Sequence, residues 1–477
     1  MLKNNFDVIV VGGGVIGCAV LKKLSEYNLS VGLIEMSNDV SKGASRANSG
    51  LVHAGFDCKP KTLKAQFNVM GNLMFENLCH ELSVDLKTNG ALVTAGAGEL
   101  DKLEELMRQG EINKVSGLEI LDYKKVHDME KNLNKNIKYA LLAKSAKIVS
   151  PYLLTVALAE SAVLNGAEIC FNTSIKNVAF TNGRYVIETS NPVVGKIYTD
   201  FVINACGAFT GLTNDIFGAE HIETAFRKGE YYLLDLTEKD FISHTIYGLP
   251  DNLGKGVLIT PTIDGNILIG PTSTFEKEPL TDVTNSGLDF IKAKADKISS
   301  SINYQKTIRV YAGVRACVGD DFLIKRSDKI LNYIYIAGIN SPGLTAAPAI
   351  AEYVFNLLNI NLIKKNLKDI KLRKPYTETR KMDVKSLNAL IAKNPDYGEI
   401  VCRCERITKG EIIEALNSCL EVDSADAVKR RVRAGGGRCQ GGFCTAKIMK
   451  IISEYKNIPM TKITKDGTGT EIAPYTI

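Results

Sequence analysis

The sequence has little net charge and no long apolar run. Its 59 lysine and arginine residues against 53 aspartate and glutamate residues leave a formal charge of +6 over 477 residues. So small an excess does not indicate nucleic-acid binding and favours at most a mild attraction to anionic molecules. No apolar stretch approaches the roughly 20 residues that cross a bilayer, so we expect no membrane span. A strand is predicted to begin within six residues of Met1, so we expect no signal peptide.

The sequence also lacks the cysteine pattern of a disulfide-stabilised secreted protein. Its eleven cysteines are an odd number, and with no signal peptide expected they predict a cytoplasmic protein with free thiols. Six are scattered between Cys18 and Cys317, mostly in apolar settings where small buried thiols are expected, and five lie in residues 402–444. The length predicts more than one domain, since single cores stop growing at about 250–300 residues.

The N-terminal stretch has the pattern of a dinucleotide-binding turn. Residues 8–11 are a β-branched run typical of a central parallel strand, and a helix is predicted over residues 16–27. A second strand over residues 30–34 leads to Glu35, where a carboxylate can accept the hydroxyl groups of a ribose. Three glycines between the first strand and the helix have the spacing G-x-G-x-x-G: Gly12, Gly14 and Gly17.

Each of these glycines has a separate mechanical role. The first permits the tight turn, the second lets backbone N–H groups approach a pyrophosphate, and the third lets the helix pack close to the strand. A glycine-rich turn alone is a weak signal, and a purely structural turn is the alternative. Because strand, turn, helix, strand and acid follow in the required order, the sequence predicts a dinucleotide site.

A second strand-to-helix turn is predicted late in the same fold. A strand over residues 333–337 is followed by Gly338, by a loop containing Pro342 and Gly343, and by a helix over residues 345–358. The N-terminus of that helix would point at an anion or a carbonyl group. The G-x-G-x-x-G spacing occurs nowhere else in the chain, so we expect a single bound dinucleotide.

Several segments together resemble FAD-dependent oxidoreductases of the glycine oxidase and D-amino-acid oxidase type. The resemblance covers residues 6 to about 360. It rests on the segments VIVVGGGVIG, SRANSGLVHAG, VINACGAF, YAGVR and AGINSPGLTAAPAIAEYV. The resemblance implies FAD, with its isoalloxazine between the 46–50 and 338–345 loops. Cys206 departs from the alanine of many relatives. The implied cofactor-binding residues are Gly12, Gly14, Gly17, Glu35, Arg46, Asn48, Ser49, Gly50, Ala205, Gly207, Gly338, Gly343, Leu344 and Thr345.

Four cysteines near the C-terminus form two close pairs in the sequence. Cys402 and Cys404 make a C-x-C motif, and Cys439 and Cys444 close the segment RCQGGFC. Four thiolates suit zinc, Cu(I) or an iron-sulfur cluster, and unligated thiols are a further alternative. Residues 398–455 resemble the [2Fe-2S] domain of bacterioferritin-associated ferredoxin, which also ends the large subunit of anaerobic glycerol-3-phosphate dehydrogenases. The resemblance implies a [2Fe-2S] cluster on these four cysteines.

The patterns predict a mixed α/β and α+β fold. It comprises a Rossmann-like FAD-binding domain, a β-rich substrate domain and a small cysteine-ligated iron-sulfur domain. Residues 364–381 carry eight lysines and arginines, which we interpret as a solvated connector. The predicted boundaries are 1–90, 145–220 and 330–362 for the FAD-binding domain, 91–144 and 221–329 for the substrate domain, 363–397 for a linker, and 398–477 for the [2Fe-2S] domain and tail.

Three side chains are candidates for the chemistry. His53 lies in the segment that the resemblance places beside the flavin and is the candidate base, with a role in loop geometry as the alternative. Arg315 is the candidate clamp for an anionic substrate, because a guanidinium binds carboxylate or phosphate at two points. Lys228 is a weaker second cation, and Arg227 is equally compatible with a surface position.

The resemblance narrows the reaction to the oxidation of an anionic secondary alcohol. Within the family the sequence is similar to L-2-hydroxyglutarate dehydrogenases and to a bacterial branch called glycerol-3-phosphate dehydrogenase, and we predict sn-glycerol 3-phosphate as the substrate. Electrons would leave FAD through the [2Fe-2S] cluster to a partner protein. L-2-hydroxyglutarate oxidation, amino-acid oxidation and a role as an electron-transfer subunit remain alternatives.

Overall fold

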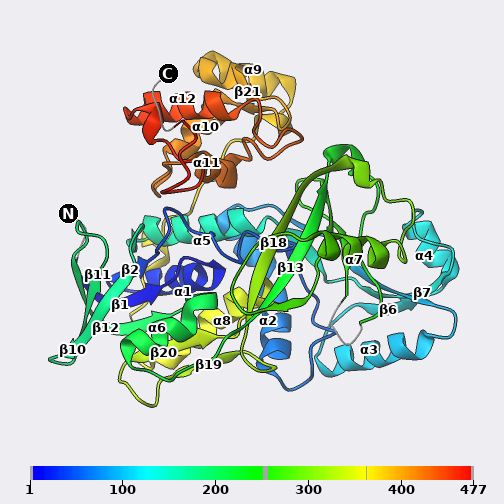
Figure 1. Cartoon of the computed structure of the whole chain (residues 1–477), viewed down its shortest axis with the longest axis horizontal. Coiled ribbons are helices and arrows are strands. Elements are labelled where there is room, and N and C mark those ends of the chain that lie inside the picture. Colours follow the sequence, from blue (N-terminus) through cyan, green and yellow to red (C-terminus); the bar gives the residue numbers. More distant parts are fainter. Residues whose placement is uncertain (1–3, 251–255, 361–362, 474–477) are drawn as a thin grey trace.

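An eight-stranded sheet forms the first part of the fold. The computed structural model describes residues 4–250, 256–360 and 363–473 (Figure 1). Five strands of this sheet run parallel in the order β9-β2-β1-β12-β20, with the buried run of β1 near the centre. The strands are β1 Asn5–Val11, β2 Val31–Ile34, β9 Glu168–Cys170, β10 Ile175–Thr181, β11 Arg184–Thr189, β12 Lys196–Asn204, β19 Leu323–Arg326 and β20 Tyr333–Ala337.

The hairpin β10–β11 extends this sheet antiparallel to β12, and β19 pairs antiparallel with β20. Apolar runs and alternation in the sequence predict strands over residues 167–172, 183–190 and 196–205, but not β10. Most side chains of β10 are exposed, so this strand has no apolar alternation to reveal it.

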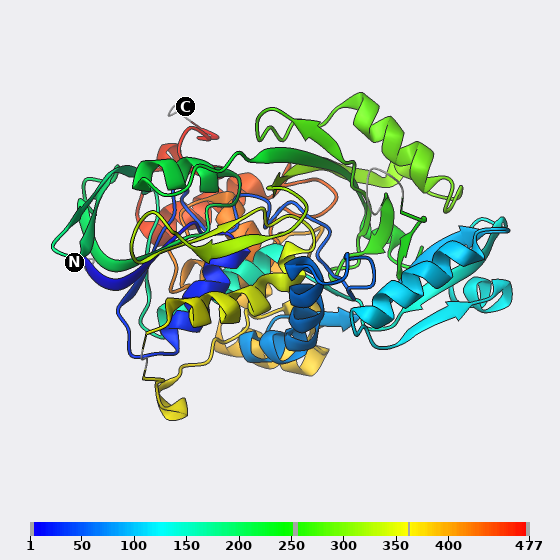
Figure 2. The same cartoon turned by 90° about the horizontal axis from the view of Figure 1, so that it is seen from below.

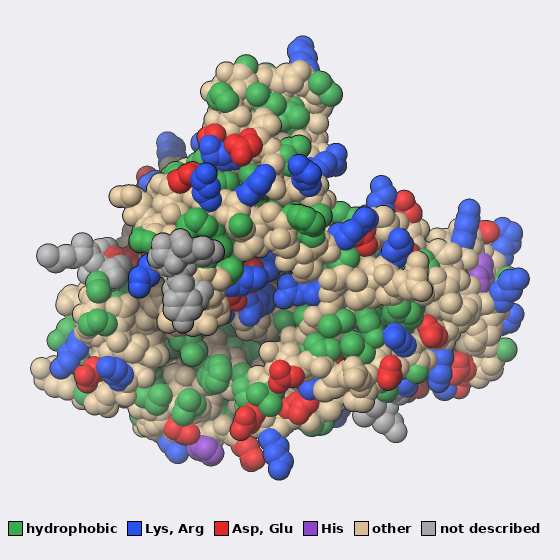
Figure 3. All heavy atoms as spheres, turned by 45° about the horizontal axis from the view of Figure 1, so that its top comes forward, with side chains coloured by type: hydrophobic (Ala, Val, Ile, Leu, Met, Phe, Trp, Pro, Cys, Tyr) green, Lys and Arg blue, Asp and Glu red, His purple; other side chains and the backbone are tan. Residues whose placement is uncertain are grey.

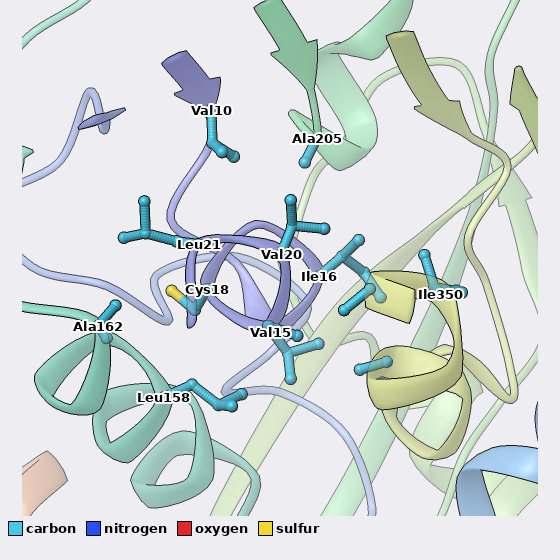
Figure 4. Close-up of a cluster of buried hydrophobic side chains, with 14 of the residues drawn as sticks. Val10, Val15, Ile16, Cys18, Val20, Leu21, Leu158, Ala162, Ala205 and Ile350 are labelled. Atoms are coloured by element: carbon cyan, nitrogen blue, oxygen red, sulfur yellow. The ribbon is translucent and has the colours of Figure 1, made fainter. Parts of the chain in front are cut away.

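Three helices pack side by side against one face of the parallel strands. Helix α1 (Val15–Ser25) lies between α5 (Pro151–Leu164) and α8 (Gly343–Leu358), and their apolar side chains form one buried cluster (Figure 4). Ser150 followed by Pro151 predicts a helix start in the sequence, and the structure confirms it, because the hydroxyl of Ser150 accepts a hydrogen bond from the first turn of α5. On the other face, α6 (Thr210–Phe217) covers a second cluster around Phe6.

A nine-stranded sheet forms the second part of the fold. Two separate stretches of chain contribute to it, in the order β6-β7-β5-β14-β15-β16-β13-β17, and β18 pairs with β13 along its whole length. Helices α3 (Leu100–Ile112), α4 (Tyr123–Met129) and α7 (Asn285–Ala295) accompany it (Figure 2). The strands are β5 Ala91–Gly96, β6 Leu118–Leu121, β7 Ile137–Ala143, β13 Ala225–Leu234, β14 Thr245–Tyr247, β15 Leu258–Pro261, β16 Ile267–Gly270, β17 Thr274–Glu276 and β18 Thr307–Cys317.

Helix α2 (Leu63–Leu82) lies beside the small sheet that joins the two large ones, and its buried face differs from the prediction. The joining strands are β3 (Leu51–Val52), β4 (Leu86–Thr88) and β8 (Lys147–Val149). The helical spacing of Leu63, Phe67, Met70, Met74 and Leu78 predicts an apolar buried face with Asn68 exposed. In the structure Asn68 is buried and Met70 is 42% exposed.

The reason for the difference is that α2 turns polar side chains inward. The side-chain amide of Asn72 donates hydrogen bonds to the carbonyl oxygens of His53, at 3.0 Å, and Ser145, at 2.8 Å. Buried amides that hydrogen-bond to loop backbone take core positions, which an apolar stripe does not predict. Helix α2 therefore holds the loop that carries His53.

A small C-terminal domain has its own hydrophobic core and lies over α5 at the top of Figure 1. Its buried side chains come from a short hairpin and from the helices that follow it. The elements are β21 Ile400–Cys402, β22 Ile407–Thr408, α10 Lys409–Leu416, α11 Ala425–Val432 and α12 Thr445–Lys456. No helix among the described residues has both the length and the apolar character needed to cross a membrane.

The segment predicted as a solvated linker is partly folded and buried. It contains helix α9 (Val384–Lys393). Arg373 is 5% exposed and its Nε lies 2.5 Å from a carboxylate oxygen of Glu160 in α5. Arg380 pairs with Asp264. The prediction of a solvated connector is wrong for these two arginines, because their carboxylate partners lie far away in the sequence.

Candidate functional site

A cavity of about 1040 Å³ lies between the two large sheets. It opens at the carboxyl ends of the parallel strands β1, β2, β12 and β20, where ligands bind in open α/β sheets. Pockets for drug-sized ligands span roughly 300–1,000 Å³, so this cavity has room for a dinucleotide together with a small substrate.

The glycine turn has the geometry that the sequence predicts. Gly12 has φ +107°, and a Cβ there would lie 2.6 Å from the carbonyl oxygen of Ala205. A Cβ on Gly17 would lie 1.9 Å from the carbonyl oxygen of Gly12, so only glycine lets α1 approach the turn this closely. Gly14 faces the cavity, and its nearest neighbour is the hydroxyl of Ser45. The first and third glycines shape the turn, and the second leaves space for a ligand.

Glu35 lines the cavity at the end of β2 and is held by backbone. Its carboxylate accepts hydrogen bonds from the N–H of Gly13, at 2.6 Å, and from the N–H of Ser37, at 2.8 Å. A carboxylate has about four lone-pair sites, so this group keeps acceptor capacity for two ribose hydroxyls. The arrangement fits the adenosine half of FAD.

Two helix N-termini border the cavity. Gly14 precedes α1 and Pro342 precedes α8, and neither residue caps its helix with a side-chain hydrogen bond. The first N–H of each helix has a partner, the hydroxyl of Ser45 for Val15 and the carbonyl oxygen of Asn340 for Gly343. The other N–H groups of a first helical turn attract anions and carbonyl oxygens. The residues present therefore fit FAD, with the pyrophosphate at α1 and a carbonyl of the ring system at α8.

The structure brings most of the predicted cofactor residues to this cavity. Those that line it are Gly12, Gly14, Glu35, Asn48, Ser49, Ala205, Gly207, Gly343 and Leu344. Gly17, Gly50, Gly338 and Thr345 lie behind the lining and support it. Cys206 also lines the cavity, and burial raises the pKa of its thiol to about 12.

Arg46 differs in position from the other predicted cofactor residues. Its guanidinium does not line the cavity but lies 2.6 Å from a carboxylate oxygen of Asp466 in the C-terminal tail. The partner follows 420 residues later in the chain, so the sequence of the 46–50 loop gave no sign of it. Arg46 links the loop between β2 and β3 to the C-terminal domain, and its role in cofactor binding stays a prediction.

His53 lines the cavity at the end of β3. Its backbone N–H donates to the hydroxyl of Thr345, at 2.9 Å, and its Nδ1 lies 3.4 Å from the hydroxyl of Tyr247. Burial raises the pKa of Tyr247 well above its usual value, so this phenol stays neutral. The loop is thus fixed at α8 and α2, and the imidazole is presented to the cavity.

Arg315 and Arg227 face each other across the strands β13 and β18. They are directly paired in the antiparallel register, and both line the cavity. Arg315 donates to the carbonyl oxygen of Thr272, at 2.8 Å, and neither arginine forms an ion pair with a carboxylate in the described chain. Burial, and after it the charge of Arg227 among other groups, lowers the pKa of Arg315. Like charges opposite each other destabilise a sheet, so this pair is suited to holding an anion.

Lys228, predicted as a second substrate-binding cation, faces away from the cavity. Arg227, which was equally compatible with a surface position, lines the cavity instead. The amino group of Lys228 lies 2.8 Å from Glu276 on the opposite face of the sheet from the cavity. Arg227, Gly229 and Tyr231 alternate along β13 and line the cavity together. The sequence shows that side chains alternate between the two faces of this strand. It does not show which face lines the cavity, because that depends on how the strand pairs with β18.

The four C-terminal cysteines pair across the two sequence motifs. The sulfurs of Cys404 and Cys439 lie 3.7 Å apart, and a hydrogen bond from the thiol of Cys444 lowers the pKa of Cys402 below its usual value. No three or more His, Cys, Asp or Glu side chains of the described residues are grouped to hold one metal ion. Two thiol pairs fit the two irons of a [2Fe-2S] cluster better than one tetrahedral zinc.

The cysteine loops touch the second sheet on one side. Arg438, next to Cys439, lies 2.7 Å from the carboxylate of Asp235 at the end of β13. The side chain of Gln440 accepts a hydrogen bond of 3.2 Å from Arg309 at the start of β18. The strands that carry Arg227 and Arg315 into the cavity therefore also reach the cysteine site.

Comparison with known proteins identifies two family models along the chain. Residues 7–357 match the model described as FAD dependent oxidoreductase, and residues 400–454 match the BFD-like [2Fe-2S] binding domain. The predictions of FAD and of a [2Fe-2S] cluster, and of the fold that holds them, are confirmed by these matches and by the solved structure described next. The alternatives of zinc and unligated thiols are set aside.

Individual relatives extend the comparison. The chain is 41% identical to glycerol 3-phosphate dehydrogenase from Caloramator mitchellensis over 98% of each protein. It is 26% identical to the mitochondrial L-2-hydroxyglutarate dehydrogenase of Arabidopsis thaliana, over 74% of this chain and 83% of that protein. The solved structure of L-alpha-glycerophosphate oxidase from Mycoplasma pneumoniae with FAD bound has a TM-score of 0.75 and 29% identity, and the match covers 79% of this chain and 100% of that one.

Proposed function

The chain belongs to the FAD dependent oxidoreductase family and ends in a BFD-like [2Fe-2S] binding domain, and we propose that it oxidises sn-glycerol 3-phosphate to dihydroxyacetone phosphate. The proposal rests on the pair Arg227 and Arg315, which lines the same cavity as the proposed base His53. The similarity to a glycerol 3-phosphate dehydrogenase over nearly the whole chain supports the choice of substrate.

The two arginines would hold the phosphate. Two guanidinium groups side by side offer forked N–H donors to a tetrahedral dianion, whereas one guanidinium satisfies a single carboxylate. Neither arginine is neutralised by a described carboxylate, so both charges are available to the substrate. This double charge favours a phosphate over the distal carboxylate of L-2-hydroxyglutarate.

His53 would take the hydroxyl proton of the substrate. FAD, when bound, supplies the acceptor for the hydride that leaves the neighbouring carbon. The backbone of His53 is fixed by Thr345 and Asn72, so the imidazole does not need to be ordered when the substrate binds. A positioned base of this kind contributes about 10²–10⁴ in rate.

The substrate assignment is tested by the reductive half-reaction. We expect anaerobic sn-glycerol 3-phosphate to bleach the flavin absorbance of the purified protein at micromolar to millimolar concentrations. L-2-hydroxyglutarate and glycine serve as the competing substrates. Bleaching by either of them, with none by glycerol 3-phosphate, would overturn the proposal. Bleaching by none of the three, but by a reduced protein partner, would instead support an electron-transfer subunit.

The electrons would pass through the [2Fe-2S] domain to a partner protein. The cysteine loops touch β13 and β18, the strands that line the cavity. A cluster held by these loops would lie where the C-terminal domain contacts the second sheet. The location of the protein in the cytoplasm stays a prediction.

A further inference from the structure

The cysteine site has an inner and an outer side. On the inner side, Arg438 and Gln440 contact the ends of β13 and β18. On the outer side, Cys404 is exposed to solvent and Phe443, the neighbour of Cys444, is 87% exposed. One edge of the cluster held by these cysteines is therefore accessible from outside the molecule.

Exposed cations lie close to Cys404 and Cys444 in the sequence. Arg403 lies between Cys402 and Cys404 in the sequence, Arg406 ends the same turn, and Lys447 lies in the first turn of α12. All three are exposed, and none forms an ion pair with any residue that the structure describes. We call Arg403, Cys404, Arg406, Phe443 and Lys447 the cluster face.

No exposed carboxylate balances these charges within the cysteine loops. Residues 402–406 and 435–447 contain one acidic side chain, Glu405, which is 2% exposed. Its carboxylate lies 2.9 Å from the guanidinium of Arg433 and 3.4 Å from that of Arg380. The single negative charge is thus buried and paired, and the cluster face is positively charged around an exposed aromatic ring.

We propose that the cluster face is the docking site of a small one-electron carrier protein with an acidic surface around its own redox centre. This inference rests on the proposed function and extends it to the electron acceptor. Exposed aromatic residues are frequent anchors of protein interfaces, and complementary charge raises association rates by 10–10³. A small charged surface around one apolar anchor fits a transient partner, which must leave after each transfer.

The electron balance requires two docking events per substrate. Oxidation of glycerol 3-phosphate releases two electrons and two protons, the electrons as a hydride and one proton through the hydroxyl group. Each carrier molecule takes one electron from the reduced cluster, so two oxidised carriers are reduced and the protons pass to solvent. The acceptor is the carrier, and no further oxidant is needed.

The proposal is tested with the holoenzyme and an oxidised Rieske-type bacterial ferredoxin of net negative charge, whose reduction potential is high enough to accept electrons from the oxidation of a secondary alcohol. The test variant is Arg403→Glu with Arg406→Glu, and the control is Lys176→Glu with Lys196→Glu, two exposed cations on β10 and β12. Binding of the oxidised ferredoxin is measured without substrate by titration, and its reduction is measured with glycerol 3-phosphate at several salt concentrations. Flavin content and the electron paramagnetic resonance spectrum of the cluster check that each variant is intact.

We expect the test variant to weaken ferredoxin binding and the second-order rate of its reduction by tenfold or more, and to abolish their salt dependence. Phe443→Ala should weaken binding by about tenfold while keeping the salt dependence, because the charges remain. The docking site would be overturned if ferredoxin binding were unchanged in both the arginine variant and Phe443→Ala. It would also be overturned if the lysine control lost as much binding as the arginine variant. Flavin bleaching by glycerol 3-phosphate should be unaffected in every variant. If bleaching fails in the wild type, the proposed function fails, and the titration still decides the docking site.

Discussion

Arg227 and Arg315 show how one step along a strand decides the chemistry of a side chain. Arg227 and Lys228 are adjacent cations in β13, yet one lines the cavity and the other pairs with Glu276 on the far face. A substrate anion in the cavity can contact only the face of β13 that lines the cavity, and the pairing of β13 with β18 determines which face that is. The residue scale is therefore where substrate affinity can be tested most directly.

The first prediction concerns Arg227. We expect Arg227→Gln to raise the KM for glycerol 3-phosphate about tenfold, equal to about 1.4 kcal/mol, with a smaller change in kcat, because it removes a charge that binds the phosphate in every state. Lys228→Gln is the matched control on the other face of the same strand. Steady-state kinetics with an artificial dye acceptor measures both. An equal KM for Arg227→Gln and the wild type would contradict the assignment.

The second prediction concerns His53. We expect His53→Gln to lower the rate of flavin reduction by about 10²–10⁴, because the base that accepts the hydroxyl proton is removed. Stopped-flow absorbance with saturating substrate measures this step alone. FAD content and the KM of the variant should stay close to those of the wild type. If the rate is unchanged, His53 has only a structural role in its loop.

At the scale of elements, the approach of α2 to α8 positions both the cofactor loop and His53. Gly71 is the contact point, since a Cβ there would lie 1.9 Å from the carbonyl oxygen of Thr345. Thr345 in turn accepts the backbone hydrogen bond of His53. A change in the spacing of these two helices is therefore transmitted to the site.

The third prediction follows from this contact. We expect Gly71→Ala to lower the free energy of unfolding by about 1–3 kcal/mol, because the added methyl group forces the two helices apart. FAD should also bind more weakly. Gly248→Ala is the control, since a Cβ there has no neighbour within 4 Å. Thermal unfolding and the release of FAD measure the two effects, and equal stabilities of the two variants would contradict the prediction.

The sequence predicts structural features that depend on neighbouring residues, but it does not predict contacts between residues far apart in the chain. The glycine turn was predictable because Gly12, Gly17 and Glu35 act within one strand-helix-strand unit. The inward face of α2 was not, because Asn68 is a polar residue in a core position. The ion pairs of Arg46 and Lys228 were not predictable because their partners, Asp466 and Glu276, lie in other elements. The cross-pairing of the four cysteines likewise depends on how two loops meet.

At the scale of the whole molecule, buried ion pairs join the C-terminal domain to the loop between β2 and β3. Asp39 is fully buried in that loop, and its carboxylate lies 2.8 Å from Arg430 and 2.9 Å from Arg431 of α11. Arg430 also pairs with Asp466, which pairs with Arg46. The cluster domain is therefore held in a fixed position relative to the flavin site, as electron transfer between the two requires.

The fourth prediction concerns this junction. We expect Asp39→Asn to lower the free energy of unfolding by about 3–5 kcal/mol, because it leaves two guanidinium groups buried with less charge compensation. Asp85→Asn, which breaks the exposed pair with Lys381, should cost less than about 1 kcal/mol. Urea unfolding followed by circular dichroism measures both. Equal losses would show that the buried pairs do not hold the domain.

The last prediction is the pH dependence of the same junction. Burial alone would raise the pKa of Asp39, but Arg431 and Arg430 outweigh it and lower that pKa below the usual value. A carboxyl group with a depressed pKa in the folded state contributes stability above its unfolded pKa of about 3.9 and loses it as the pH falls through the folded pKa. The stability difference between the wild type and Asp39→Asn should therefore be constant from pH 7 to about pH 5 and shrink below about pH 4. Urea unfolding of both proteins in the same acidic buffers measures it, and since acid removes iron from both alike, the difference reports the carboxylate. A gap that stays constant down to pH 3 would show that proton uptake by Asp39 does not weaken the junction.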